Sequence, residues 1–151
     1  MTPEALFEKV RLDELYFLAT GGGVTFGGGE PLLYPEFIRE FRALCGSAWH
    51  LCVETSLFVP WENIESVIDS VDMFYFDCKD TDPTIYQKYT GKDNSVVLEN
   101  IKKLAQLVPP EKITVRIPLI PGFNTKADQE RSVQYFSSLG LHIFDLFTYV
   151  E

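Results

Sequence analysis

The chain has 151 residues, with 13 basic and 22 acidic side chains and a formal net charge of −9. Its apolar fraction of 46% is typical of a soluble globular protein and excludes a disordered chain. The acidic balance argues against a nucleic-acid-binding protein, because phosphates repel such a surface. No apolar run reaches the ~18 residues of a membrane span, and the N-terminal residues show no signal-peptide pattern.

Cysteine usage favours a reducing compartment, so we expect a cytoplasmic protein. The three cysteines, Cys45, Cys52 and Cys78, are odd in number, which argues against a disulfide framework. Their separations match no CxxC-type spacing, so we predict no metal site among them. Free cysteine is commonly buried, and all three are interpreted as core residues. His50 and His142 are interpreted as structural or exposed.

Helix and strand signals alternate along the whole chain. Thr2 and Pro3 are typical of a helix N-terminus, and the glycines at 21–23 end that helical segment. Later helices are expected from Pro35, from Pro60, around residues 97–105 and over 128–139, with a short helical turn over 82–91. Strands are expected at residues 24–26, 49–53, 71–76, 113–120 and 141–147.

This alternation predicts an α/β fold with a parallel sheet covered by helices. Five strands cannot close an eight-stranded barrel, so either the sheet is open or a first strand is missing. Ligands of parallel α/β folds bind at the carboxyl ends of the strands. Polar residues gather directly after the predicted strands, at Glu30, Glu54, Asp77, Lys79 and Asn124.

The segment from Thr25 to Pro31 carries three consecutive glycines after a predicted strand. Glycine adopts positive φ readily and lets backbone N–H and C=O groups approach a ligand, although a tight turn between strand and helix explains the pattern as well. The segment lacks the Lys-Ser/Thr of a Walker loop and the spacing of a dinucleotide-binding fingerprint.

Three further positions are candidates for charge recognition. Alternation along a strand places Asp77 and Lys79 on one side, where they suit a zwitterionic ligand or form an internal ion pair. Glu54 is placed to hold an ammonium group or a cation, or to act as a solvated loop acid or helix cap. Arg116 lies inside an apolar strand, where it meets an anionic ligand or pairs with an acid such as Asp77 or Glu54.

Together these segments resemble the radical S-adenosylmethionine (SAM) enzymes. Residues 21–32, GGGVTFGGGEPL, are similar to the glycine-rich segment of enzymes that activate glycyl radical enzymes, such as the pyruvate formate-lyase activating enzyme. The similarity continues, in family order and spacing, through residues 53–56, 76–79, 90–91 and 115–124. The resemblance implies a partial (β/α) barrel of the radical SAM type, with about five parallel strands, helices outside and the first strand missing.

The resemblance also implies a SAM site built from eight residues: Gly28, Gly29, Glu30, Pro31, Glu54, Asp77, Lys79 and Arg116. The backbone of the glycine-rich segment matches the part that meets the methionyl amino group of SAM. The two acids after the strands match contacts to that amino group or to a nearby monovalent cation. The lysine matches one that faces the methionyl carboxylate, and the arginine matches one near SAM and the substrate loop.

Two departures from the family are visible. The CxxxCxxC motif, whose thiolates hold a [4Fe–4S] cluster that chelates SAM, is absent from these residues. Val150 stands where relatives often have a histidine that helps to hold SAM. We therefore interpret residues 1–151 as a single domain, a truncated radical SAM core that is inactive alone.

The parent enzyme would reduce SAM through its cluster to a 5′-deoxyadenosyl radical, which abstracts hydrogen from a backbone glycine of a partner enzyme. Alternatives are a cluster-free SAM- or peptide-binding module and a decayed enzyme. An unrelated phosphate binder is disfavoured, because no lysine or arginine lies near the glycine-rich segment. A missing first strand would leave an open sheet edge, so we expect self-association or low stability.

Overall fold

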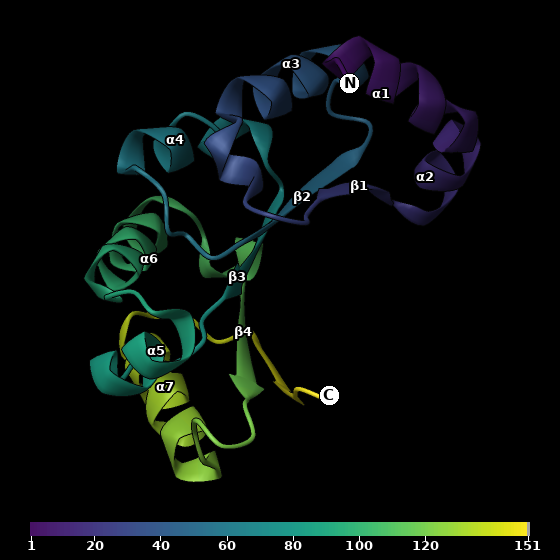
Figure 1. Cartoon of the computed structure of the whole chain (residues 1–151). Coiled ribbons are helices and arrows are strands. Elements are labelled where there is room, and N and C mark those ends of the chain that lie inside the picture. Colours follow the sequence, from purple (N-terminus) through teal and green to yellow (C-terminus); the bar gives the residue numbers. More distant parts are fainter. Residues whose placement is uncertain (151) are drawn as a thin grey trace. The chain divides into compact units, whose positions relative to one another are not determined.

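The computed structural model describes residues 1–150 and contains a five-stranded sheet (Figure 1). The strands are β1 (Gly23–Phe26), β2 (His50–Thr55), β3 (Met73–Asp77), β4 (Ile113–Leu119) and β5 (Phe144–Thr148). Their order in the sheet follows the sequence, β1-β2-β3-β4-β5. Parallel pairing sets Thr25 opposite Cys52 and Arg116 opposite Asp145. The predicted α/β class, with five strands in a parallel sheet, is confirmed.

Helices connect the strands, as the alternating pattern predicts. They are α1 (Pro3–Val10), α2 (Glu14–Thr20), α3 (Pro35–Cys45), α4 (Trp61–Glu65), α5 (Pro83–Thr90), α6 (Ser95–Leu107) and α7 (Lys126–Ser138). Short 3₁₀ segments cover Arg11–Asp13, Pro31–Leu33, Ile68–Ser70 and Pro110–Lys112. The termini follow capping chemistry: the Thr2 hydroxyl accepts the Ala5 N–H at 3.2 Å, and Pro3 takes the first helical position.

Three helical predictions need correction. The first helical segment is interrupted by the 3₁₀ turn at Arg11–Asp13, which divides it into α1 and α2. The helix expected to carry Ile64, Val67 and Ile68 on one face ends at Glu65, and its last turn is a separate 3₁₀ segment. The expected short turn at 82–91 is an eight-residue helix, α5, with two backbone N–H groups capped by Asp82.

The chain divides into two compact units, each with its own core. The N-terminal unit comprises residues 1–54 and 59–74, and the C-terminal unit comprises residues 55–58 and the chain from Tyr75 onward. In the N-terminal unit, α1 packs along α3 (Figure 1). The buried side chains of Phe41, Trp49 and Leu51 form the centre of its core. Phe7 of α1 stacks on Trp49 with ring centroids 5.2 Å apart.

In the C-terminal unit, α5, α6 and α7 gather on the same side of β4 (Figure 1). Phe76 of β3 and Phe136 of α7 are fully buried and meet edge to face at 5.7 Å. Ile101 and Leu104 of α6 and Ile117 of β4 are also completely buried. Among residues 1–150, no helix combines the length and the apolar character that crossing a bilayer requires.

Candidate functional site

The glycine-rich segment forms an exposed loop directly after β1. Gly28 and Gly29 have φ values of 76° and 68°, a region in which a side chain would be strained. An added Cβ at either position would meet no atom within 4 Å, so the backbone of both residues is open to a ligand. The loop lines a cavity of about 470 Å³ together with Phe37 and Ile38 of α3.

The side chain of Glu30 has a local structural role. Its Oε1 accepts the Leu32 N–H at 3.2 Å and caps the short 3₁₀ segment that starts at Pro31. Pro31 suits this first position because its ring fixes φ and no N–H is needed there. Glu30 and Pro31 therefore shape the backbone of the loop.

Glu54 lies at the end of β2 and contacts the glycine loop. A Cβ on Gly27 would lie 3.1 Å from Oε2 of Glu54, a closer approach than most side chains tolerate. Gly27 therefore leaves the space that the half-buried Glu54 carboxylate occupies. Within the N-terminal unit, the structure brings the glycine loop and Glu54 together.

Asp77 and Lys79 line one pocket of about 190 Å³ in the C-terminal unit. Cys78 between them is fully buried, as the predicted alternation of side chains requires. Lys79 Nζ donates to the Tyr149 hydroxyl at 2.5 Å and lies 5.1 Å from the centre of its ring. Sequence reasoning did not single out Tyr149, because no local pattern joins residues 70 positions apart.

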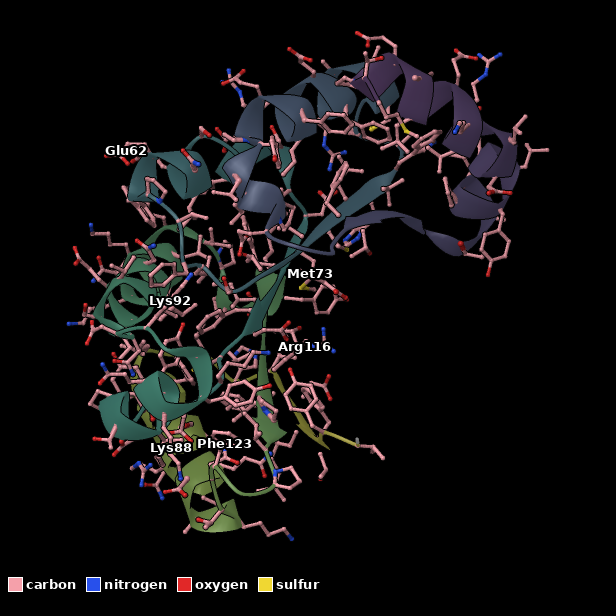
Figure 2. The ribbon with its side chains drawn as sticks, in the orientation of Figure 1. Glu62, Met73, Lys88, Lys92, Arg116 and Phe123 are labelled. Carbon is pink, nitrogen blue, oxygen red and sulfur yellow. The ribbon has the colours of Figure 1, made fainter. Side chains whose placement is uncertain are left out.

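Arg116 projects from β4 (Figure 2). Its side chain pairs with two acids. Its Nε lies 3.5 Å from Asp77 Oδ1 and 3.4 Å from Asp145 Oδ2, and its guanidinium carbon lies 5.3 Å from the Phe147 ring centre. The alternative of a structural pair with Asp77 is thus confirmed. Asp145 was missed, although it stands directly opposite Arg116 in the parallel register.

A hydrogen-bond network holds together the loops after β3 and β4. Asp80 is 1% exposed, and its carboxylate accepts the Asp82 N–H at 2.9 Å and the Asn124 amide at 3.2 Å. Arg131 of α7 approaches the same carboxylate at 3.4 Å. The Asn124 side chain also accepts the Ile120 N–H at 2.6 Å. Asn124, a predicted strand-end polar residue, therefore fixes the loop that follows β4.

Comparison of the sequence with models of protein families identifies the family of this chain. The sequence model described as "Radical SAM superfamily" matches residues 1–130. The chain belongs to the radical SAM superfamily.

Curated relatives of this radical SAM chain are activating enzymes. The (2S)-3-sulfopropanediol dehydratase activating enzyme of Klebsiella oxytoca is 40% identical over 125 residues, which cover 82% of this chain and 39% of that enzyme. The indoleacetate decarboxylase activating enzyme of Tractidigestivibacter scatoligenes is 33% identical over 139 residues, covering 91% and 44%. The chain spans about two-fifths of the length of these relatives.

Solved structures of other proteins share the fold. A domain of the pyruvate-formate lyase-activating enzyme from Bacteroides vulgatus ATCC 8482 matches with a TM-score of 0.58 at 24% identity, covering 83% of this chain and 98% of that domain. Streptococcus suis SuiB bound to S-adenosylmethionine matches with a TM-score of 0.77 at 13% identity, covering 100% of this chain and 34% of SuiB. At these identities the likeness establishes the fold.

The iron–sulfur cluster of radical SAM enzymes does not fit the cysteines of this chain. Cluster ligands are thiolates, whereas burial raises the pKa of the thiols of Cys45, Cys52 and Cys78. Cys52 and Cys78 are 8% and 0% exposed, and Cys45 is partly buried. Among residues 1–150, no group of three or more His, Cys, Asp or Glu side chains is arranged to hold a metal ion.

Proposed function

We propose that the chain is the SAM-binding core of an enzyme that generates a glycyl radical on a partner enzyme of the pyruvate formate-lyase kind. The observation that carries this proposal is the superfamily match, together with curated relatives that are named as activating enzymes. The partner is a protein substrate, and the expected compartment is the cytoplasm. When bound, SAM supplies the hydrogen-abstracting chemistry. The cluster would have to be held by cysteines other than those at 45, 52 and 78.

The polar residues after the strands suit the methionyl part of SAM. The Lys79 ammonium pairs with the methionyl carboxylate, because this lysine lines a pocket and carries a positive charge. In the N-terminal unit, Glu54 beside the open glycine loop suits an ammonium group or a cation. In the C-terminal unit, Asp77 suits a group of the same kind. Gly28 and Gly29 contribute backbone groups, and Arg116 orients Asp77 from 3.5 Å. We further propose that residues 1–151 act as one truncated radical SAM core.

Calorimetric titration of the chain with SAM tests this proposal. We expect a saturable heat for the wild type. Lys79→Ala should bind SAM with an affinity at least tenfold lower, since a charge-assisted hydrogen bond is worth about 1.5–3 kcal/mol. Lys112→Ala serves as a control for loss of one positive charge, because this exposed lysine precedes β4. A wild-type protein that is folded by circular dichroism and gives no saturable heat would refute the proposal.

A second candidate function is a cluster-free module that binds SAM or a peptide without catalysis. The burial of Cys52 and Cys78 favours it, because neither thiol is available as a ligand. Anaerobic reconstitution with iron and sulfide tests whether the cysteines of this chain hold a cluster. We expect no bound cluster and no cleavage of SAM by residues 1–151 alone. A reconstituted [4Fe–4S] protein that cleaves SAM would show that the cysteine assignment is wrong.

A further inference from the structure

The pocket that contains Asp77 and Lys79 has a second positively charged wall. Lys92, which follows α5, lines the same space of about 190 Å³, as do Phe58 and Thr90. All of these residues belong to the C-terminal unit. Lys92 carries no motif signal in the sequence, and the function proposed above gives it no role.

Lys92, labelled in Figure 2, is held in position by contacts of its backbone and side chain. Gly91 ends α5 with a φ of 75° and turns the chain. The Lys92 N–H donates to the Thr90 hydroxyl at 3.1 Å, and that hydroxyl donates to the Tyr86 carbonyl at 2.8 Å. The Lys92 Nζ lies 4.4 Å from the centre of the Phe58 ring. The lysine is thereby held against one wall of the pocket.

The loop that carries Phe58 is itself anchored. The buried side-chain amide of Asn100, on α6, donates to the Leu57 carbonyl at 2.9 Å, and Leu57 is fully buried. Leu57 also has a positive φ of 56°, which directs the chain into this turn. The aromatic face under Lys92 is therefore part of a fixed framework.

The charges around the pocket favour an anion. Two basic residues, Lys79 and Lys92, line the space together with one acidic residue, Asp77. That carboxylate already lies 3.5 Å from the Arg116 guanidinium. Like charges that share a small pocket repel each other, and a bound anion relieves the repulsion. A positive pocket stands out in a chain with a net charge of −9.

We propose that Lys92 is a second cationic contact for the carboxylate that Lys79 binds, namely the methionyl carboxylate of SAM. This inference rests on the function proposed above and adds a binding residue to it. Tyr86, buried at the pocket wall with a pKa raised to about 12 by burial, remains a neutral phenol that does not compete with the anion.

Calorimetry with two ligands and two matched variants tests the role of Lys92. Lys92→Gln should bind SAM about five- to twentyfold more weakly than the wild type, since the charged contact of an exposed lysine is lost. Decarboxylated SAM, which lacks the carboxylate, should bind Lys92→Gln and the wild type equally. Lys92→Arg should restore most of the affinity for SAM, because it keeps the charge.

Lys88→Gln is the control. Lys88 is an exposed lysine of α5 that also lies over an aromatic ring, 5.6 Å from the centre of Phe123, and it does not line this pocket (Figure 2). The variant should bind both ligands as the wild type does. Unchanged SAM affinity of Lys92→Gln, or an equal loss for both ligands, would overturn the assignment while leaving the proposed function in place. A wild type that binds no SAM would overturn both.

Discussion

Cys78 lies between the two polar residues that line the pocket, yet its own side chain has no exposed surface. Burial is the main reason that the pKa of its thiol is raised, and the nearby Asp80 carboxylate adds to the effect. Burial also raises the pKa of Cys45 and Cys52. The reactivity of each thiol is therefore limited by access and by its small thiolate fraction.

Alkylation kinetics should follow this order of burial. With iodoacetamide under native conditions, we expect Cys45 to be modified first, Cys52 more slowly, and Cys78 only after unfolding. Peptide mass spectrometry over a time course measures the three rates, and the same reaction in denaturant gives the reference. Rapid native labelling of Cys78 would contradict the burial of its side chain.

Asp72 provides a pH-dependent contribution to stability in the N-terminal unit. Partial burial of its carboxylate raises the pKa, but the Leu51 N–H, which donates at 2.8 Å, and the Arg42 guanidinium outweigh that effect and lower the pKa below its usual value. The stabilisation is therefore present above the unfolded-state pKa of about 3.9 and is lost as pH falls through the lower folded-state pKa.

Asp72→Asn should lower the free energy of unfolding by about 1 kcal/mol at pH 7, a value reduced for solvent screening. The reduction is needed because the Asp72 side chain is 36% exposed. The difference from the wild type should shrink below pH ~4. Urea denaturation at several pH values measures it, with Asp69→Asn as the exposed control. A difference that grows on acidification would have the wrong sign for this mechanism.

At the scale of elements, the positions of proline and glycine in the sequence predicted several helix ends correctly. Pro3, Pro35 and Pro83 occupy the first positions of their helices, and Gly46 and Gly91 follow the last ones. Strand limits were less accurate: β3 begins at Met73 rather than Val71, and β5 begins at Phe144 rather than Leu141. An apolar run does not show where ladder pairing starts, because that depends on the neighbouring strand.

The start of α7 was predicted at Asp128, three residues beyond its actual N-cap, Thr125. Thr125 and Asp128 form a capping box: the hydroxyl accepts the Asp128 N–H at 3.3 Å, and the carboxylate accepts the Thr125 N–H at 2.8 Å. Thr125→Ala should therefore lower the free energy of unfolding by about 1 kcal/mol. Thermal denaturation followed by circular dichroism measures it, and Ser137→Ala, in the last turn of α7, should have little effect.

The sequence predicted those site residues that directly follow a strand. It did not predict the contacts between residues that are far apart in the sequence. Asp77 and Lys79 share a pocket because the alternation of side chains along a strand places both on the same side of the chain. The contacts of Lys79 with Tyr149 and of Arg116 with Asp145 depend on how separate strands align. Lys92 enters the pocket through a turn after α5, and no periodic pattern marks such a position.

At the scale of the whole molecule, β1 stands at one end of the strand order. Within residues 1–150, its neighbour in the sheet is β2 alone, so its other edge offers backbone groups for pairing. Large apolar side chains of the preceding segment are also exposed: Leu12, Leu15, Tyr16 and Leu18. We therefore expect concentration-dependent self-association of the chain.

Analytical ultracentrifugation over a range of concentrations tests this expectation. Thr25→Lys places a charge on an exposed position of β1 and should weaken the association, because charged residues discourage edge-to-edge pairing. Its melting temperature should stay close to that of the wild type. A chain that remains monomeric at all concentrations would argue against an accessible edge.

Both tryptophans, Trp49 and Trp61, belong to the N-terminal unit. Trp49 is packed among aromatic rings in the core of that unit. The molecule thus contains an optical probe of one half, and Cys78 supplies a chemical probe of the other. Tryptophan fluorescence and Cys78 labelling, followed through one urea titration, measure cooperativity between the halves. For a single folding domain we expect coincident midpoints.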